Sequence, residues 1–286
     1  MKLSQIDSYW NRYLSEWDNS PFGKAMSEKA ARRFFHKSSL LNAGISYMPE
    51  PYYGDINNPY CVIINLNPGL SHPMDWVKQH SSGGFIYNDL HNGSYSVVNQ
   101  KYSPFLPSSI TSIGTPKAIP GADWWNENRM KWINSFLHRL YGSHIPDLAQ
   151  PLALELCPWH SVKWGRGIVE GMGSFLFDTV LEPAADAIGP NRFGFCFGKE
   201  VGEILIDNGF LVVQQWDKDS SPNTWPLGQK GNKVNRTYRL LGGVVKGKKV
   251  LFLNHYAYGS FKTPGRAFAE NVEPQIIRDL HAMGFK

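Results

Sequence analysis

The chain of 286 residues has few cysteines, no long apolar run and only a small excess of positive charge. Its three cysteines, Cys61, Cys157 and Cys196, lie in apolar segments and form no Cys-X-X-Cys pair. An ordinary iron–sulfur cluster needs four thiolates, so we expect reduced core thiols in an intracellular protein instead. No segment approaches the roughly 20 apolar residues of a membrane span. Residues 1–5 begin no apolar stretch, so we expect no signal peptide and a cytoplasmic location.

Motifs that would indicate a metal or a nucleotide cofactor are missing as well. The nine histidines form neither a His-X-His nor a His-Glu-X-X-His pattern, and no glycine-rich phosphate loop is present. We therefore expect no metal and no cofactor. Internal repeats, low-complexity tracts and an interdomain linker are also absent from the sequence. Residues 1–286 are expected to form a single domain, in which residues 1–50 are a helical N-terminal extension packed on the rest.

The composition permits a nucleic-acid partner without demanding one. The formal net charge is +5, and aromatic residues make up 14% of the chain, including ten tryptophans. Such aromatics either fill a rich core or provide stacking surfaces for bases, and composition alone favours the core.

Apolar periodicity predicts an α/β fold. Short apolar strands that alternate with amphipathic helices are typical of a three-layer sandwich with a mainly parallel central sheet. We expect helices over residues 3–17, 25–36, 124–141, 168–187, 198–205 and 267–283, and strands over residues 61–64, 152–157, 193–197, 211–215 and 250–253. Residues 47–54 are expected to be irregular, and residues 70–122 to form a long loop region.

Polar or glycine residues follow several of the predicted strands. Asn67, Glu155, Gly198 and His255 each lie at the end of an apolar strand or just beyond it. In open α/β sheets ligands bind at the carboxyl ends of the strands. We therefore expect these four residues to lie along one edge of the sheet.

Four of these segments resemble motifs of the uracil-DNA glycosylase superfamily, and one of them is the strand–Gly198-Lys199–helix unit, which is similar to the family's third segment. Residues 65–70 read Asn-Leu-Asn-Pro-Gly-Leu, similar to the Gly-X-Asn-Pro-Gly motif of the single-strand-selective and mismatch-specific/thymine branches. Residues 254–258, Asn-His-Tyr-Ala-Tyr, stand where the family has His-Pro-Ser-Pro, without its prolines and serine. Residues 155–158, Glu-Leu-Cys-Pro, resemble Asn-Leu-Cys-Pro, whose Asn reads the uracil edge. The resemblance covers residues 60–285 and implies a glycosylase-like α/β fold.

The resemblance also implies roles for individual residues. Asn67 matches the catalytic Asn that holds a water beneath the sugar C1′, and His255 matches the His that stabilises the leaving base. Phe85 would stack under an extruded base, and Asn65, which replaces a glycine, would lie near the base or the sugar. Candidate DNA contacts are Tyr258 and Phe261 as wedges and Lys262, Arg266 and Lys199 at phosphates. Lys199, at a predicted helix start, has a structural role as its alternative.

Glu155 would then decide which base is excised. An ionised carboxylate accepts hydrogen bonds and donates none, so it suits the amino group of cytosine better than uracil. We therefore hypothesise a modified cytosine, and the chain resembles a phage-defence glycosylase that removes glucosylated hydroxymethylcytosine. The alternative for Glu155 is a strand-end carboxylate paired with an Arg or Lys.

The leading hypothesis is a monofunctional DNA glycosylase that acts on double-stranded phage DNA, without a membrane or an obligate protein partner. Alternatives are a uracil or thymine-mismatch repair glycosylase, a non-catalytic nucleic-acid-binding protein of the same fold, and a hydrolase of free nucleosides.

Overall fold

The computed structural model describes most of the predicted strands and several of the helices. The described residues are 1–18, 43–44, 50–66, 95, 101–106, 117–118, 125–146, 148–158, 160–161, 173–216, 237–256 and 272–286. Within these ranges, no helix combines the length and the apolar character that crossing a bilayer requires.

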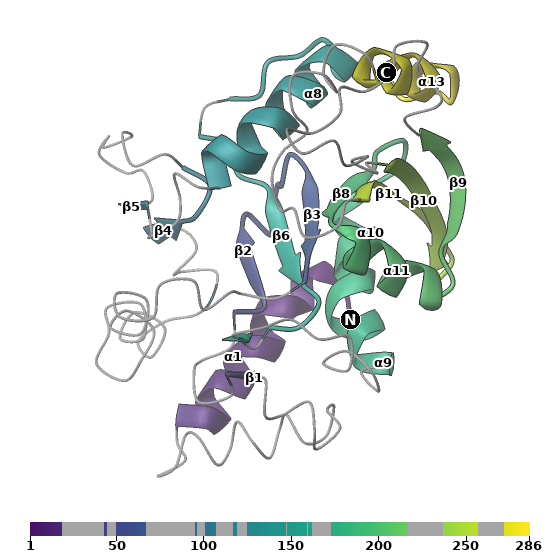
Figure 1. The fold of residues 1–286 in the computed structure, drawn as a ribbon. Coiled ribbons are helices and arrows are strands. Elements are labelled where there is room, and N and C mark those ends of the chain that lie inside the picture. Colours follow the sequence, from purple (N-terminus) through teal and green to yellow (C-terminus); the bar gives the residue numbers. More distant parts are fainter. Residues whose placement is uncertain are drawn as a thin grey trace, which may run out of the picture.

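A seven-stranded sheet forms the centre of the fold (Figure 1). Its strands, in spatial order, are β2 (Tyr52–Gly54), β6 (Leu152–Glu155), β3 (Val62–Asn65), β8 (Gly194–Phe197), β11 (Lys248–Tyr256), β10 (Thr237–Val245) and β9 (Leu211–Trp216). The four strands β6, β3, β8 and β11 are parallel, whereas β2, β10 and β9 run antiparallel to their neighbours. The expected α/β class is therefore confirmed, with a mixed sheet whose centre is parallel.

The order in which the chain enters the parallel strands creates a topological switch point, a place in the sheet where the strand order reverses. The chain passes from β3 outward to β6 and then returns across β3 to β8 and β11. The connection that leaves β3 and the connection that leaves its neighbour β8 therefore run in opposite directions across the sheet. A crevice at the carboxyl ends of the strands is the usual ligand site at such a position.

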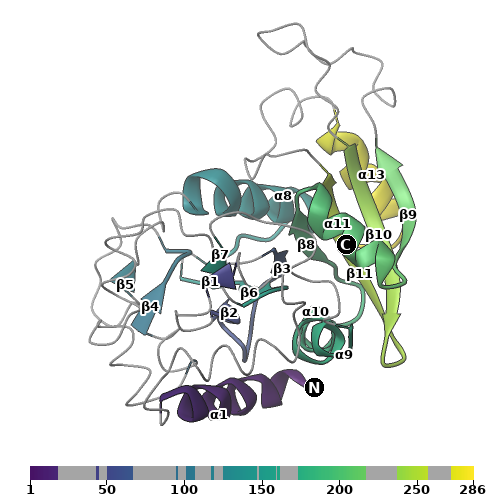
Figure 2. The ribbon, with the colours of Figure 1, turned by 60° about the horizontal axis from the view of Figure 1, so that its bottom comes forward.

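Helices cover both faces of the sheet. One face packs against α8 (Lys131–Tyr141), its preceding π-helical turn η2 (Asn126–Met130) and α13 (Glu273–Ala282). The other face packs against α1 (Ile6–Asp18), α9 (Gly173–Leu176), the turn η4 (Phe177–Leu181), α10 (Glu182–Ile188) and α11 (Lys199–Asp207). Figure 2 shows α8 and α1 on opposite sides of strands β2, β6 and β3. Two apolar cores, one on each face, make the three-layer arrangement.

Helix α8 shows how the periodic pattern works. Ile133, Phe136, Leu137 and Leu140 are spaced for one helical face and are all buried against the sheet. The helix ends at Gly142, which adopts a left-handed φ of 65°. The predicted helix over 124–141 is therefore confirmed where the structure describes it.

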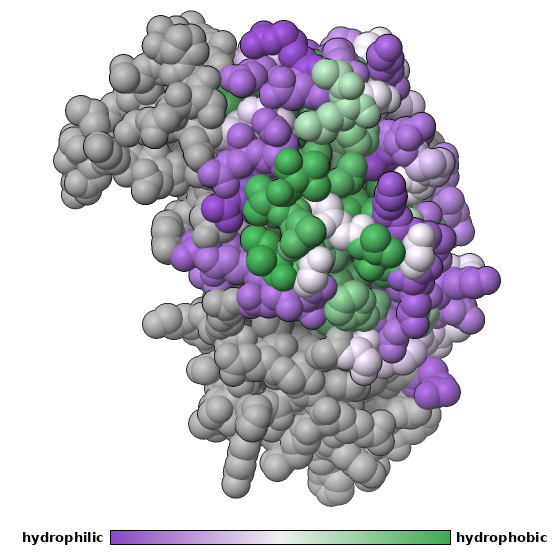
Figure 3. All heavy atoms as spheres, turned by 90° about the vertical axis from the view of Figure 1, so that its right-hand side faces the viewer, coloured by the Kyte–Doolittle hydropathy of each residue, from purple (hydrophilic) through white to green (hydrophobic). Residues whose placement is uncertain are grey.

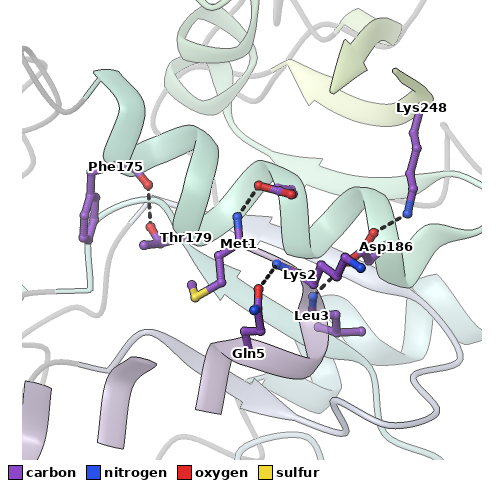
Figure 4. Close-up of polar contacts among 9 residues, drawn as sticks. Met1, Lys2, Leu3, Gln5, Phe175, Thr179, Asp186 and Lys248 are labelled. Carbon is purple, nitrogen blue, oxygen red and sulfur yellow. Dashed lines mark hydrogen bonds and ion pairs between the residues drawn. The ribbon is translucent and has the colours of Figure 1, made fainter. Parts of the chain in front are cut away.

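The predicted helix over 3–17 is confirmed by the short turn η1 (Leu3–Gln5) and α1, and Ile6 and Trp10 enter the core. Figure 4 shows the first residues of this segment held on α10, where Lys248 of β11 reaches the same Asp186 carboxylate. The Met1 amine pairs with Glu182, the Leu3 backbone N–H donates to Asp186 Oδ2 over 2.9 Å, and Lys248 pairs with Asp186. These contacts dock the first described residues on the domain.

Two strands of the seven-stranded sheet, β2 and β10, were not predicted. The prediction of an irregular segment over 47–54 is wrong for β2, which adds an antiparallel edge strand beside β6. Strand β10 contains Gly242 and Gly243, which usually weaken a strand. Here a Cβ would meet the Val213 side chain at 2.6 Å and the Phe210 ring at 2.8 Å, respectively. The close packing of neighbours over the hairpin explains why glycine occupies the middle of this strand.

Other boundaries differ modestly. Strand β11 is longer than the predicted 250–253, because its hairpin with β10, closed by a turn at Lys246 and Gly247 with φ of 48° and 80°, extends the pairing on both sides. Strand β6 ends at Glu155 rather than 157, and α13 begins at Glu273 rather than 267 within the described residues. The predicted helix over 25–36 lies outside the described residues.

The outer strands carry an apolar surface. Leu211, Val212 and Val213 of β9 and Val244 of β10 are exposed. Figure 3, viewed from the side on which β9 lies, shows an apolar area bordered by polar residues.

A glycine substitution tests the close approach at the edge of the sheet. Gly54 has a φ of +92°, and a Cβ there would lie 1.8 Å from the Pro151 carbonyl oxygen. We expect Gly54→Ala to lower the free energy of unfolding by about 3 kcal/mol or more, because left-handed strain and a backbone clash add together. Gly142→Ala is the matched control, with a φ of +65° but open space, and should cost about 1 kcal/mol. Urea unfolding measures both, and equal losses would contradict the packing around Gly54.

Candidate functional site

One row of side chains crosses the parallel strands near their carboxyl ends. Asn65 of β3 pairs in register with Glu155 of β6, and His255 of β11 pairs with Phe197 of β8. Ile64 pairs with Cys196, which places Asn65 and Phe197 at the same level of the sheet. Because side chains alternate between faces, all four point to the face covered by η2 and α8. The structure thus brings three of the candidate site residues, Asn65, Glu155 and His255, to one edge of the sheet.

The Asn65 side chain bridges two charged residues. Its Nδ2 donates to Glu155 Oε1 over 2.9 Å, and its Oδ1 accepts from Arg129 Nη1 over 2.6 Å. The three residues are only 4–6% exposed. Hydrogen bonds that involve charged partners in a buried place are stronger than neutral surface ones. Arg129, Asn65 and Glu155 therefore form one connected buried network, which we call the Arg129–Asn65–Glu155 network.

Two aromatic rings enclose the Arg129 guanidinium. Its central carbon lies 4.4 Å from the centre of the Trp125 ring and 4.9 Å from that of Phe197. Such cation–π contacts partly replace the water that the cation loses. Burial lowers the pKa of Arg129 to about 10, while Glu155 opposes that shift. The guanidinium therefore stays cationic at neutral pH. It projects from η2, a π-helical turn, and such turns recur at functional sites.

The Glu155 carboxyl is buried at an unusual pKa. Burial raises the pKa from 4.5 to about 8, although the Asn65 hydrogen bond and the Arg129 charge each lower it, and the nearby Glu50 raises it again. A substantial neutral fraction is therefore present at pH 7. Within the part of the chain that the structure describes, Glu155 Oε2 is buried without a hydrogen-bond partner.

The phenol of Tyr53 and the carboxyl of Glu50 interact with Glu155. Burial and a hydrogen bond to Glu50 raise the pKa of Tyr53 well above its ordinary value, and Glu155 adds to that shift. The Glu50 backbone N–H donates to the Pro158 carbonyl over 2.8 Å, which fixes the segment before β2 against the end of β6. Negative charge is therefore unfavourable around Glu155 except near Arg129.

His255 is held rigidly at the end of β11. Its ring stacks on Tyr238 of β10, with ring centres 4.8 Å apart and an angle of 15° between the planes, and meets Phe197 edge-on. It is 1% exposed. The Gly198 backbone N–H donates to the His255 carbonyl over 2.8 Å. The two ring contacts hold the plane of the His255 imidazole against Tyr238 and Phe197.

The neighbouring Asn254 ties this strand end to the turn after β8. Its Nδ2 donates to the carbonyl oxygens of Cys196 and Gly198, each over 3.1 Å. The start of α11 is therefore attached to the end of β11. Lys199, the first residue of α11, pairs with Glu203 one helical turn later over 3.2 Å. That pairing accounts for Lys199 structurally and leaves its predicted DNA contact untested.

The remaining predicted site residues lie outside the described residues: Asn67, Phe85, Tyr258, Phe261, Lys262 and Arg266. Asn67 follows Leu66, whose carbonyl accepts from the Cys157 backbone N–H over 2.9 Å. The chain is therefore still paired with the segment after β6 one residue before Asn67. Among the described residues, no group of three or more His, Cys, Asp or Glu side chains is arranged to hold a metal ion.

Arg129 is the site residue that the sequence analysis did not identify. It lies four residues before Ile133 and eight before Leu137, so it falls on the apolar face of the predicted helix. A charged side chain on such a face usually has a buried partner. The sequence therefore shows that Arg129 is a charged residue on an apolar helix face. It does not show that the partners of Arg129 are Asn65 on β3 and Glu155 on β6.

Comparison of the chain with protein-family models, curated proteins and solved structures found no match.

The raised pKa of Glu155 predicts a pH-dependent stability. In the unfolded chain the carboxyl ionises near 4.5, whereas in the fold it ionises near 8. Between these values the unfolded state binds fewer protons, so Glu155 makes the fold less stable as pH rises from about 4.5 to about 8, with no further change above. Glu155→Gln keeps an oxygen for Asn65 and removes this titration. Relative to wild type, it should gain on the order of a few kcal/mol between pH 5 and pH 9.

Urea unfolding of both proteins at the two pH values measures the difference. Glu127→Gln, at an exposed position in η2, is the control and should follow the wild-type pH dependence. A Glu155→Gln curve parallel to wild type would contradict a buried carboxyl that ionises late.

Proposed function

We propose that this protein is a monofunctional DNA glycosylase with a uracil-DNA glycosylase-like fold, which hydrolyses the N-glycosidic bond of an extruded base and leaves an abasic site. The observation that carries the proposal is the buried contact between Asn65 and Glu155 at the carboxyl ends of β3 and β6, beside the switch point. Ligands of open α/β sheets bind at this place. Asn67 follows the last residue of β3 by two positions in the sequence, and this proximity in the chain supports its proposed membership of the same site.

The chemistry of base excision suits such a site. The transition state carries positive charge on the sugar and growing negative charge on the leaving base, so rigid dipoles and hydrogen-bond donors lower the barrier. His255, held by Tyr238 and Phe197, supports this role because its ring needs little reorganisation. Asn67 positions the attacking water in the proposal.

The base read by Glu155 depends on the protonation of its carboxyl. An ionised Glu155 accepts from the N4 amino group of cytosine. A neutral Glu155 offers one donor and one acceptor, which match the N3 and N4 positions of cytosine. We therefore propose a cytosine-type base, with glucosylated hydroxymethylcytosine in phage DNA as the candidate and defence against such phages as the setting.

Uracil stays as a second candidate because of the same carboxyl. A neutral Glu155 can donate to uracil O4 and accept from uracil N3–H, which an ionised carboxylate cannot do. The pKa of about 8 makes this form available at neutral pH. The uracil-repair alternative therefore has a specific physical basis.

A base-release assay tests the function. Duplexes that contain cytosine, hydroxymethylcytosine, glucosylated hydroxymethylcytosine, uracil or a thymine mismatch are incubated with the full chain, and abasic sites are detected by strand cleavage. We expect release from a modified cytosine, and a loss of about 10²- to 10³-fold in Asn67→Ala, by analogy with the removal of a single stabilising donor. Asn58→Ala, at an exposed turn, is the matched control and should act as wild type.

The other outcomes identify the alternatives. DNA binding without release of any base would indicate a non-catalytic binding protein, and turnover of free nucleosides alone would indicate a nucleoside hydrolase. Base release that survives Asn67→Ala unchanged would remove the proposed role of Asn67.

A further inference from the structure

In the Arg129–Asn65–Glu155 network, the donor and the acceptor of each hydrogen bond are determined by the guanidinium. A guanidinium can only donate hydrogen bonds, so the Asn65 oxygen must face Arg129 and its amide nitrogen must face Glu155. Glu155 Oε1 is therefore the acceptor of the Asn65 hydrogen bond. In the neutral carboxyl the proton lies on the other oxygen, Oε2.

The second carboxyl oxygen, Glu155 Oε2, has hydrogen-bonding capacity that the described residues do not use. It is buried, and no described residue donates to it or accepts from it. Asn65, Arg129 and Glu50 shift the pKa of Glu155, and Glu155 in turn raises the pKa of Tyr53. Buried polar atoms of folded proteins rarely stay without a partner, and those that do need an explanation. A ligand atom that accepts a proton from Oε2 would supply one.

The leaving bases differ at the atom that such a donor would reach. Cytosine carries a lone pair on ring N3, whereas uracil and thymine carry a hydrogen there. Cytosine is a poor leaving group as an anion, and protonation at N3 makes it leave as a neutral molecule. A substituent at C5 leaves N3 unchanged. A carboxylic acid at this position would therefore assist the excision of cytosine and of its C5-modified forms, and it could not assist uracil in the same way.

Building on the proposed function, we infer that Glu155 Oε2 is the general acid that protonates N3 of a cytosine-type base, and that Arg129 is the positioning residue that assigns this proton through Asn65. As the C1′–N1 bond breaks, its electron pair stays with the base and the Oε2 proton moves to N3. Water adds its hydroxyl to C1′ and releases its proton to solvent. Glu155 then takes a proton from solvent, which closes the cycle.

The electrostatics agree with this role. Burial raises the pKa of Glu155 to about 8, so the acid form predominates at pH 7. A general acid works best when its pKa lies near the working pH. The rate of cytosine-type excision should therefore be constant below that value and fall as pH rises through it.

The test measures single-turnover base release from pH 6 to pH 10 on the best modified-cytosine duplex and on a uracil duplex. For the full chain we expect a decline near pH 8 with modified cytosine and none at that pH with uracil. Glu155→Gln keeps one donor and one acceptor but cannot transfer a proton. It should slow modified-cytosine release by about 10²- to 10⁴-fold, the usual range for an acid catalyst, without a similar effect on uracil.

Two outcomes would overturn the inference while the glycosylase function stands. These are a Glu155→Gln rate within a few-fold of wild type on modified cytosine, and wild-type profiles with the same decline for both bases. The second comparison needs no variant, so it holds even where Glu155→Gln fails to fold. Glu273→Gln is the matched control, a buried Glu paired with Arg139 on another helix, and should keep the wild-type profile. Absence of base release from every duplex would instead contradict the proposed function itself.

The positioning role of Arg129 is tested separately, by the pH at which the rate declines in Arg129 variants. Because the Arg129 charge lowers the pKa of Glu155, Arg129→Met should move the decline in rate to higher pH, and Arg129→Lys should move it part of the way back. A purely structural role for Arg129 would lower activity or folded fraction without moving the decline. An unchanged midpoint in folded Arg129→Met protein would refute the positioning role.

Discussion

Burial of the Arg129 guanidinium is the constraint on which the candidate site depends. A cation taken out of water is costly unless partners replace its hydration. Here Trp125 and Phe197 cover its faces, Asn65 accepts one of its hydrogen bonds, and Glu155 accepts the Asn65 amide in turn. These partners come from η2, β3, β6 and β8, so the network can form only when the parallel centre of the sheet is complete. Fold and site are therefore specified together at this edge.

The second half of the edge is built by the β10–β11 hairpin. Tyr238 positions the His255 ring, and Asn254 attaches the end of β11 to the turn that begins α11. Phe197 contacts both Arg129 and His255, which joins the two halves of the site. Such fixed polar groups need little movement when charge develops on a ligand, and this is the property that electrostatic catalysis requires.

The sequence predicted those helices and strands whose burial is determined by a local residue pattern. Apolar periodicity predicted α8, and short β-branched or aromatic runs predicted β3 and β8, because each pattern reports directly which side chains are buried. Strand β10 was missed since Gly242 and Gly243 are explained by packing against Val213 and Phe210, which only the fold brings near.

The candidate site was likewise predictable only where local sequence position determines which residues meet. The positions of Glu155 and His255 at strand ends were predictable, because carboxyl ends of parallel strands meet at one edge. The role of Asn65 as a bridge was not, since it depends on register with β6 and on Arg129, 64 residues away. The raised pKa of Glu155 was not predictable either, because the burial that raises it arises only from tertiary packing.

The proposed general acid requires a Glu155 carboxyl that stays largely neutral at pH 7. The most direct measurement is a carbon-13 NMR titration of protein labelled at the glutamate carboxyl carbon, with the Glu155 signal identified by its loss in Glu155→Gln. The account predicts a titration near pH 8 for that signal. A Glu155 signal that titrates near its ordinary value of 4.5 would contradict the account.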